Sequence, residues 1–319
     1  MIRVEGLQKV YGDFAAVVDS TFSVAEGEVF GLVGPNGAGK TTTLKTLSGL
    51  VEPTAGDVRV AGYDVSDPEM RRVLGFLPEE SPLYEDMTPR SYLRFFGDLY
   101  DVDRELTDER AGRALDRLDL EHRDRRLGDM SKGMKRKVAI ARSLVNDPKV
   151  LVYDEPASGL DPLTTNEVLE FVRELRAGGK TVVFSAHNLY HVESVCDRVA
   201  VMNEGEIIAR GAVADIRAEN GETEYHVTTT VAVADAEPVE GVAVAGVAGE
   251  DDGRVTGETD RYRVVVDDVA TVETVRDAAR AAGGEVVDIR SREPSLEDVF
   301  LDLTGESMPG RRRVAGGDA

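Results

Sequence analysis

Glycine, lysine and threonine residues that could bind phosphate are gathered in one short segment. This segment reads Gly34, Pro35, Asn36, Gly37, Ala38, Gly39, Lys40, Thr41 and Thr42. It fits the pattern GxxxxGK[ST], in which glycines without Cβ atoms let successive backbone N–H groups converge on one phosphate. Lys40 would charge-pair with the β- and γ-phosphates, Thr41 would bind Mg²⁺ and Thr42 would donate to a phosphate. The segment therefore predicts a nucleoside triphosphate site that uses Mg²⁺.

Two consecutive carboxylates, Asp154 and Glu155, follow an apolar run and are candidates for hydrolytic chemistry. Asp154, at the end of a strand, can hold a Mg²⁺-bound water beside Thr41. Glu155 projects differently and is placed to orient or deprotonate the attacking water, a role worth roughly 10²–10⁴ in rate. His187 ends the apolar run 181–186, where it could donate to a γ-phosphate, hold Glu155 in place, or serve a structural purpose. The carboxylates favour hydrolysis over nucleotide binding alone.

A third candidate anion site is the turn Ser131–Met134, which opens a predicted helix. Backbone N–H groups at a helix start attract anions. Nothing in the order of the chain suggests that this turn reaches its own phosphate loop, and it could instead serve a second copy. Only eight of the 38 basic residues are lysines, and three of these lie within 132–137. This cluster is consistent with a nearby phosphate, although a solvated helix start gives the same pattern.

The elements that must position these residues alternate as in an α/β protein. The apolar run 28–33 precedes the phosphate loop and a helical pattern begins at Lys40, which is the strand, loop and helix order that the motif requires. The runs 150–154 and 181–186 predict two further buried strands of a parallel sheet.

A helix with an aromatic face is predicted from residue 88 onward. Thr88 and Pro89 suit its N-cap and first turn. The apolar residues that follow at helical spacing are Tyr92, Phe95, Phe96, Leu99 and Tyr100. Such a face can be buried within a helical subdomain, and it is large enough to present one part to a partner.

Together these motifs resemble those of the ATPase subunit of ABC transporters over about residues 2–212. In order, they are the adenine-stacking aromatic Tyr11, the Walker A loop 34–42, the Q-loop position Leu77-Pro78-Glu79, the signature turn Ser131–Met134, the Walker B pair Asp154 and Glu155, the D-loop Ser158–Asp161 and the switch histidine His187. The resemblance implies an α/β P-loop NTPase of the ABC type with an inserted helical subdomain at about 88–147.

The resemblance also implies a mechanism. Two such domains close head to tail around two ATP molecules, so that Ser131 and Gly133 of one copy cover the ATP on the phosphate loop of the other. The D-loop residues Ser158 and Asp161 belong to this dimer contact. Hydrolysis opens the dimer and passes the motion to a separate integral-membrane permease. The second ATPase subunit is either identical or a paralogue.

Two positions depart from the family pattern. Glu79 stands where the family has Gln, a neutral ligand of Mg²⁺ or its water, and a carboxylate there could tighten metal binding. Lys132 and Met134 replace Gly and Gln, so Lys132 could add a cation near the phosphates or point to solvent. Both departures resemble export ATPases that work with type-2 ABC permeases, including sodium and drug efflux systems. On that resemblance we expect an active site.

Length, composition and charge restrict where the protein acts and what it can bind. The chain of 319 residues is longer than one typical domain and has no apolar run near the ~20 residues that span a bilayer. It opens without the apolar core of a signal peptide, so we expect a cytoplasmic protein held at the membrane face by its permease, without direct insertion. The single cysteine, Cys196, excludes an intrachain disulfide. The net charge of −22 argues against nucleic acid as a partner.

The same acidic balance with few lysines resembles proteins from a high-salt cytoplasm. At molar salt the Debye length is about 3 Å, so repulsion among the acidic residues is screened. We therefore hypothesise that the fold is adapted to salt.

A second domain is expected because the composition changes after Gly211. The predicted organisation is an ATPase domain over 1–214, a linker over 215–222, a small α+β domain over 223–305 and a disordered tail over 306–319. Within the small domain, Ser295 and Asp298 resemble a capping box at the start of the last helix. The domain could serve dimer contact, regulation or permease docking, or only stability.

The leading hypothesis is an ATP hydrolase that powers export through a membrane permease. The alternative is a soluble ABC-type ATPase outside transport. Repair ATPases carry a long coiled coil between the Walker motifs, and translation factors carry two cassettes; this chain has neither. A nucleotide sensor without turnover is a third hypothesis, and Glu155 and His187 argue against it.

Overall fold

The computed structural model describes residues 1–220, 223–233, 243–245, 261–266 and 268–304. Contacts divide the chain into two compact units, Met1–Ile216 and Arg217–Ala319. The expected tail 306–319 and most of the segment between the strands of the second unit lie outside the described residues. Each unit is described by itself.

The first unit is built on a sheet with the strand order β5-β4-β1-β2-β10-β9-β3-β8-β7-β6. Its strands are β1 (Ile2–Tyr11), β2 (Phe14–Val24), β3 (Val29–Val33), β4 (Ala55–Val60), β5 (Tyr63–Asp64), β6 (Leu74–Leu77), β7 (Val150–Tyr153), β8 (Thr181–Ala186), β9 (Arg198–Asn203) and β10 (Glu206–Ala212). β6, β7, β8, β3 and β9 are parallel neighbours, whereas β1 pairs antiparallel with β2 and β4. The predicted strands at 28–33, 150–154 and 181–186 are confirmed as β3, β7 and β8.

The parallel strands form the interior of this unit. All residues of β3, β7 and β8 are buried, as expected for strands covered on both faces. The helices around the sheet are α1 (Lys40–Leu47), α5 (Pro162–Ala177) and α6 (Leu189–Val195), with a short 3₁₀ helix at Pro68–Arg72. The predicted helix after the phosphate loop is confirmed as α1.

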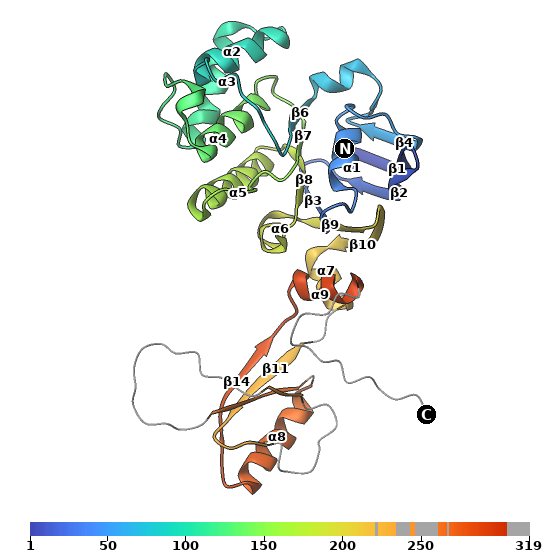
Figure 1. The fold of residues 1–319 in the computed structure, drawn as a ribbon, viewed down its shortest axis with the longest axis vertical. Helices are drawn as coiled ribbons and strands as arrows, with labels where there is room; N and C mark the ends of the chain where they lie inside the picture. The colour runs from blue at the N-terminus through green and yellow to red at the C-terminus, as the bar shows by residue number, and fades with distance from the viewer. Residues whose placement is uncertain (221–222, 234–242, 246–260, 267, 305–319) are drawn as a thin grey trace. The chain divides into compact units, whose positions relative to one another are not determined.

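Three helices gather apart from the sheet, between β6 and β7 in the sequence (Figure 1). They are α2 (Pro89–Leu99), α3 (Arg104–Arg117) and α4 (Lys132–Arg142), with a 3₁₀ turn at Leu127–Asp129 before α4. Thr88 caps α2 by accepting the Ser91 N–H at 3.2 Å, and Pro89 occupies its first turn, as predicted.

The aromatic face of α2 is divided between core and surface. Tyr92 is fully buried and its ring centroid lies 4.9 Å from that of Phe96. Phe95 lies against Phe96 and against the exposed Tyr84 in edge contacts, and Leu99 is exposed. One part of the face therefore holds the helices together, while another part remains on the surface.

The second unit contains a four-stranded sheet with the order β12-β13-β11-β14. Its strands are β11 (Glu224–Thr229), β12 (Ala243–Ala245), β13 (Tyr262–Val266) and β14 (Val286–Arg292), and its helices include α8 (Val269–Ala281) and α9 (Leu296–Thr304). Val272, Val275 and Ala279 of α8 share a buried core with the strands. The capping box is also confirmed, because the Asp298 N–H donates to Ser295 Oγ at 3.2 Å and the Ser295 N–H donates to the Asp298 carboxylate at 2.9 Å.

The predicted linker at 215–222 contains the boundary between the two units, at Ile216 and Arg217, and most of it is helical, because Val213–Asn220 forms helix α7. The segment contains alanine and glutamate, which favour helix, and Ile216 is buried and anchors it. Its polar residues suggested a loop, but one apolar anchor per two turns is enough to fix a short helix to a surface.

Candidate functional site

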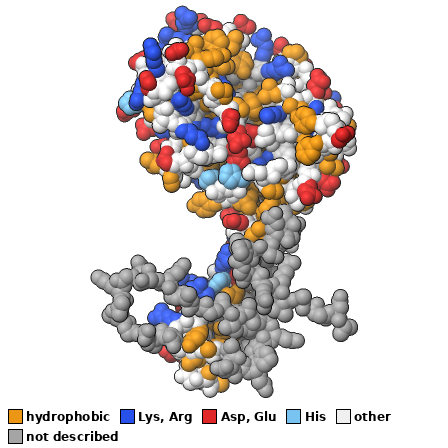
Figure 2. Space-filling view, in the orientation of Figure 1, with side chains coloured by type: hydrophobic (Ala, Val, Ile, Leu, Met, Phe, Trp, Pro, Cys, Tyr) orange, Lys and Arg blue, Asp and Glu red, His pale blue; other side chains and the backbone are white. Residues whose placement is uncertain are grey.

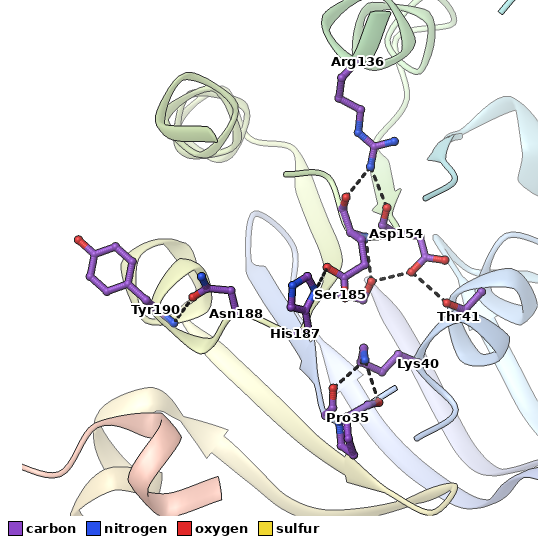
Figure 3. Close-up of polar contacts among 11 residues, drawn as sticks. Pro35, Lys40, Thr41, Arg136, Asp154, Ser185, His187, Asn188 and Tyr190 are labelled. Carbon is purple, nitrogen blue, oxygen red and sulfur yellow. Dashed lines mark hydrogen bonds and ion pairs between the residues drawn. The ribbon is translucent and has the colours of Figure 1, made fainter. Parts of the chain in front are cut away.

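The candidate site lies where four parallel strands end side by side. Val33 pairs with Ala186, Tyr153 with Phe184, and Leu77 with Tyr153. The segments that follow these strands carry the phosphate loop, His187, the Asp154–Glu155 pair and Glu79, so the strand register brings residues from across the chain to one edge (Figure 3).

The phosphate loop is fitted closely to the backbone around it. A Cβ atom on Gly34 would lie 2.2 Å from the Met202 carbonyl oxygen, and one on Gly39, whose φ is +101°, would lie 2.5 Å from that of Ala16. Only glycine fits these positions without displacing backbone. The tight loop therefore explains two of the three glycines of the motif.

The Lys40 ammonium lies at this loop and donates to the carbonyls of Gly34 at 2.7 Å and Pro35 at 3.1 Å (Figure 3). Lys40 is buried, and this burial lowers the pKa of its ammonium, while the nearby carboxylates of Glu155, Asp154 and Glu79 act in the opposite direction. The site thus combines a held cation with several carboxylates, which is the charge arrangement that a phosphate and a divalent metal would balance.

Asp154 is 1 % exposed and is held by two hydroxyl groups. Ser185 Oγ donates to Asp154 Oδ1 at 2.6 Å, and Thr41 Oγ1 donates to the same oxygen at 3.3 Å (Figure 3). A threonine hydroxyl beside an ionisable carboxylate is a suitable pair of hard oxygen ligands for Mg²⁺. Among the described residues there is no cluster of three or more His, Cys, Asp or Glu side chains that could hold a metal by itself. The pair therefore fits an ion whose remaining ligands come from phosphate and water.

Glu155 adopts an unusual backbone conformation for a residue other than glycine, with φ of +46°. Its N–H donates to Ser185 Oγ at 3.0 Å, and its carboxylate Oε2 lies 2.8 Å from His187 Nδ1. This conformation turns the Glu155 side chain away from that of Asp154, so the two neighbouring carboxylates have separate partners. The contact between Glu155 and His187 matches one of the three roles considered for this histidine, that of holding Glu155 in place.

A pocket of about 400 Å³ lies beside this pair. It is lined by the segment 155–160, the first turns of α5, the end of β8 and the start of α6. Figure 2 shows acidic side chains gathered beside histidine in the middle of the exposed face of the first unit. The His187 imidazole is therefore reached from solvent, whereas the Glu155 carboxylate beside it is nearly buried.

Arg136 on α4 is a buried residue of this site that the sequence did not single out. Its guanidinium donates to the carbonyls of Asp154 and Glu155 at 3.0 and 2.6 Å, to Pro156 at 2.8 Å, and to Pro78 and Glu79 at 2.8 and 2.9 Å. Burial lowers the pKa of Arg136 to about 10, while the charges of Asp154 and Glu79 oppose this shift. Arg136 therefore remains protonated at neutral pH.

The sequence of α4 contains a pattern that could have identified Arg136 as a buried residue. Arg136 occurs three, four and seven residues before Ala139, Ile140 and Ser143, which are all buried. A charged residue on the apolar face of a helix indicates either a buried ionic contact or a polar network. Ser185, likewise missed, is a polar residue that directly follows the apolar run Val182–Phe184 in a fully buried strand.

The signature turn Ser131–Met134 begins α4 and adjoins the D-loop Ser158–Asp161 of the same chain. Ser131 Oγ caps α4 by accepting the Met134 N–H at 3.2 Å. A Cβ on Gly159 would lie 2.2 Å from Lys132 Nζ, so the Lys132 ammonium rests against the D-loop. Asp161 caps α5 by accepting the Thr164 N–H at 3.0 Å, and bonds from this N–H and the Thr164 hydroxyl lower the pKa of the Asp161 carboxyl.

Tyr11 and Glu79 occupy the margins of the site. Tyr11, at the end of β1, is 46 % exposed, and its ring centroid lies 4.9 Å from Lys9 Nζ. Glu79 is exposed in the loop after β6, and its charge raises the pKa of both Lys40 and Arg136 against the effect of burial. Glu79 is therefore within electrostatic reach of the phosphate loop, while Tyr11 presents a ring on the surface.

The fold and the site together define a P-loop nucleotide-binding protein. A sequence profile described as ABC transporter matches residues 17–158, and one described as ATP-binding protein DrrA1-3-like, C-terminal domain, matches residues 211–304. None of the helices within the described ranges combines the length and apolar character that crossing a membrane requires.

Proteins similar to the whole chain carry related descriptions. The daunorubicin resistance ATP-binding protein DrrA3 of Streptomyces coeruleorubidus is 36% identical over 308 residues, which cover 96% of each chain. The Nod factor export ATP-binding protein I of Rhizobium sp. (strain N33) is 35% identical over 311 residues, covering 96% of this chain and 98% of that protein. This chain therefore belongs to the ATP-binding proteins of ABC transporters, a family of ATPases.

Solved structures agree with this assignment. One described as the ATP-binding subunit of an ABC transporter is 34% identical, with a TM-score of 0.64, and the match covers 69% of this chain and 92% of that one. Another is a dimeric post-hydrolysis state of the ATP-binding cassette MJ0796 bound to ADP and Pi, 26% identical, with a TM-score of 0.61 over 66% of this chain and 98% of that one.

Proposed function

We propose that two copies of this chain close around two ATP molecules and hydrolyse them to drive export through a separate membrane permease. The observation that carries the proposal is the cluster at one sheet edge, where Glu155 contacts His187 while Asp154 contacts Thr41 beside the Lys40 loop. A held general base, a metal-binding pair and a phosphate-binding loop are the parts that ATP hydrolysis needs.

Thr41 and Asp154 would hold Mg²⁺, with Glu79 as a further candidate ligand. When bound, Mg²⁺ neutralises charge on the β- and γ-phosphates. The loop N–H groups and the Lys40 ammonium orient the same phosphates, and the Thr42 hydroxyl adds a donor. Asp154 is suited to its role because two hydroxyls already hold its carboxylate in one orientation.

Glu155 accepts the proton of the attacking water in this proposal. Its φ of +46° and its bond to His187 direct the carboxylate, and the buried surroundings exclude competing water. His187, more than half exposed on its side chain, holds Glu155 from the solvent side and can donate to the γ-phosphate. Together the two residues supply the positioned base that hydrolysis requires.

The second copy completes each site. The N–H groups at the start of α4, at Ser131 and Gly133, would cover the phosphates held by the partner's loop, while Ser158 and Asp161 of the D-loop line the contact. Tyr11 would stack on adenine. The dimeric state of the cassette MJ0796, bound to ADP and Pi, supports this arrangement.

Export is proposed because relatives are described as drug resistance and Nod factor export proteins. The chain would then lie on the cytoplasmic face of the membrane, bound to its permease through the exposed part of the aromatic surface around Tyr84, Phe95 and Leu99. The DrrA-like second unit belongs to the same assembly.

The test of hydrolysis is steady-state phosphate release from the purified full-length chain with ATP and Mg²⁺ at increasing protein concentration. The specific rate should rise with concentration as dimers form, whereas a fully active monomer would contradict the proposal. Affinity purification of the chain from detergent-solubilised membranes distinguishes export from the alternative, a soluble ATPase outside transport. Co-purification of an integral-membrane ABC permease supports export, and its absence from an active ATPase supports the alternative.

A further inference from the structure

The guanidinium of Arg136 uses every hydrogen-bond donor that it possesses. An arginine side chain has five N–H donors, and those of Arg136 meet five different backbone carbonyl oxygens between 2.6 and 3.0 Å. All these acceptors are main-chain atoms, so the residue secures the path of the backbone rather than one side chain.

The five carbonyls belong to two separate segments. Pro78 and Glu79 follow β6, whereas Asp154, Glu155 and Pro156 follow β7. Arg136 itself comes from α4, so one side chain joins a helix to the ends of two neighbouring strands. Figure 3 shows its bonds to the segment after β7. A displacement of either segment therefore changes the bonds that hold the other.

The backbone of Glu155 needs such support. A left-handed φ is unfavourable for a residue with a Cβ atom and persists only where the surroundings enforce it. The Glu155 N–H is held by Ser185 and its carbonyl by Arg136, at 3.0 and 2.6 Å. Arg136 thus bonds to the carbonyls of both peptides that flank the Glu155 Cα atom, and the Ser158 N–H donates to the second of these carbonyls at 3.1 Å.

We infer that Arg136 is a positioning residue for ATP hydrolysis, which holds the Glu155 backbone so that the carboxylate meets His187 and the attacking water. The inference rests on the proposed role of Glu155 as the base. Through Pro78 and Glu79, Arg136 also ties the base to the loop after β6, so that movement of that loop changes the position of Glu155.

The experiment compares Arg136→Met and Arg136→Lys in the full-length chain, with kcat, KM and affinity for a fluorescent ATP analogue as readouts. Arg136→Met should lower kcat by about a hundredfold, the scale of losing a positioned base. ATP-analogue affinity should change less than about threefold, because the Lys40 loop is not a partner of Arg136. Arg136→Lys, with three donors for five carbonyls, should give an intermediate kcat.

Arg142→Met is the matched control. Arg142 lies on the same helix, but it bonds to the Phe76 carbonyl at 3.1 Å and to Tyr92 Oη at 3.3 Å rather than to the segment 154–156. Its kcat should remain within about threefold of the unchanged protein, at a melting temperature similar to that of Arg136→Met. Equal losses of kcat in both variants would overturn the inference.

A double variant that combines Arg136→Met with Glu155→Gln distinguishes a role of Arg136 in positioning Glu155 from a role in folding. The double variant should still form an ATP-dependent dimer by light scattering, because α4 keeps the ion pair of Lys137 with Glu167 at 2.7 Å. Loss of that dimer, or an ATP-analogue affinity that falls as much as kcat, would assign Arg136 a structural role only. Rapid hydrolysis by Glu155→Gln alone would instead overturn the proposed base, whatever Arg136→Met does.

Discussion

Glu155 Oε2 lies 2.8 Å from Nδ1 of His187, and the two side chains come from the ends of adjacent parallel strands. The carboxylate is almost fully buried, whereas the imidazole is more than half exposed. The contact therefore links a sheltered base to a ring that a second subunit or a phosphate can approach. This relationship decides what the first two variants should do.

Glu155→Gln keeps the shape of the side chain and removes the base. We expect phosphate release to fall by about 10²–10⁴, because proton transfer from water loses its acceptor. ATP should still bind, so the variant should accumulate as an ATP-bound dimer. Phosphate release and light scattering with ATP test both parts, and a variant that hydrolyses rapidly would remove Glu155 as the base.

His187→Ala removes the partner that directs Glu155. Turnover should fall by about tenfold or more, since a mobile base is less often in place. His191→Ala is the control, because His191 lines the same pocket, whereas the hydrogen bond to the Glu155 carboxylate comes from His187. The measured kcat should be lower for His187→Ala than for His191→Ala, and equal losses would show that His187 has no special role.

Lys40→Ala removes the cation from the phosphate loop. Affinity for ATP should fall by about tenfold or more, because the ammonium is the side-chain charge aimed at the β- and γ-phosphates. Lys45→Ala, five residues further along α1, should bind almost normally. Equilibrium binding of a fluorescent ATP analogue provides the measurement, and unchanged affinity of Lys40→Ala contradicts the loop assignment.

Ser131→Arg places a bulky cation at the start of α4. We expect it to block ATP-driven dimerisation while each monomer still binds ATP, because the turn faces the partner's nucleotide in the proposed dimer. Ser131→Ala should lose about 1 kcal/mol of stability with its N-cap but still dimerise. Light scattering with ATP compares the two, and a normal dimer of Ser131→Arg argues against the role in trans.

Dialysis from molar salt to low salt should lower the melting temperature. The net charge of −22 implies repulsion among the acidic side chains. This repulsion acts over longer distances as salt is removed, because the Debye length grows from about 3 Å at 1 M to about 30 Å at 0.01 M. Scanning calorimetry or circular dichroism across a salt series measures the change. A melting temperature independent of salt contradicts the hypothesis of salt adaptation.

Most of the site could be predicted because its residues follow strands whose apolar runs are short and distinct. Each of β3, β7 and β8 matches its predicted run within one residue, and parallel strands present their carboxyl ends at one edge. Helix α7 was missed because Ile216 is the one buried residue among its described side chains, so no repeated apolar pattern marks it in the sequence.

The order of motifs by itself determined the class of protein, since each motif is local and carries its chemistry in consecutive residues. Only the tertiary structure decided how these groups are held: Ser185 on Asp154, Arg136 on five carbonyls, and Glu155 in a left-handed conformation. The bonds of Arg136 alone join residues that lie between 18 and 58 positions apart in the sequence. Every residue has a main-chain carbonyl, so the amino-acid types do not indicate which carbonyls a buried guanidinium will contact.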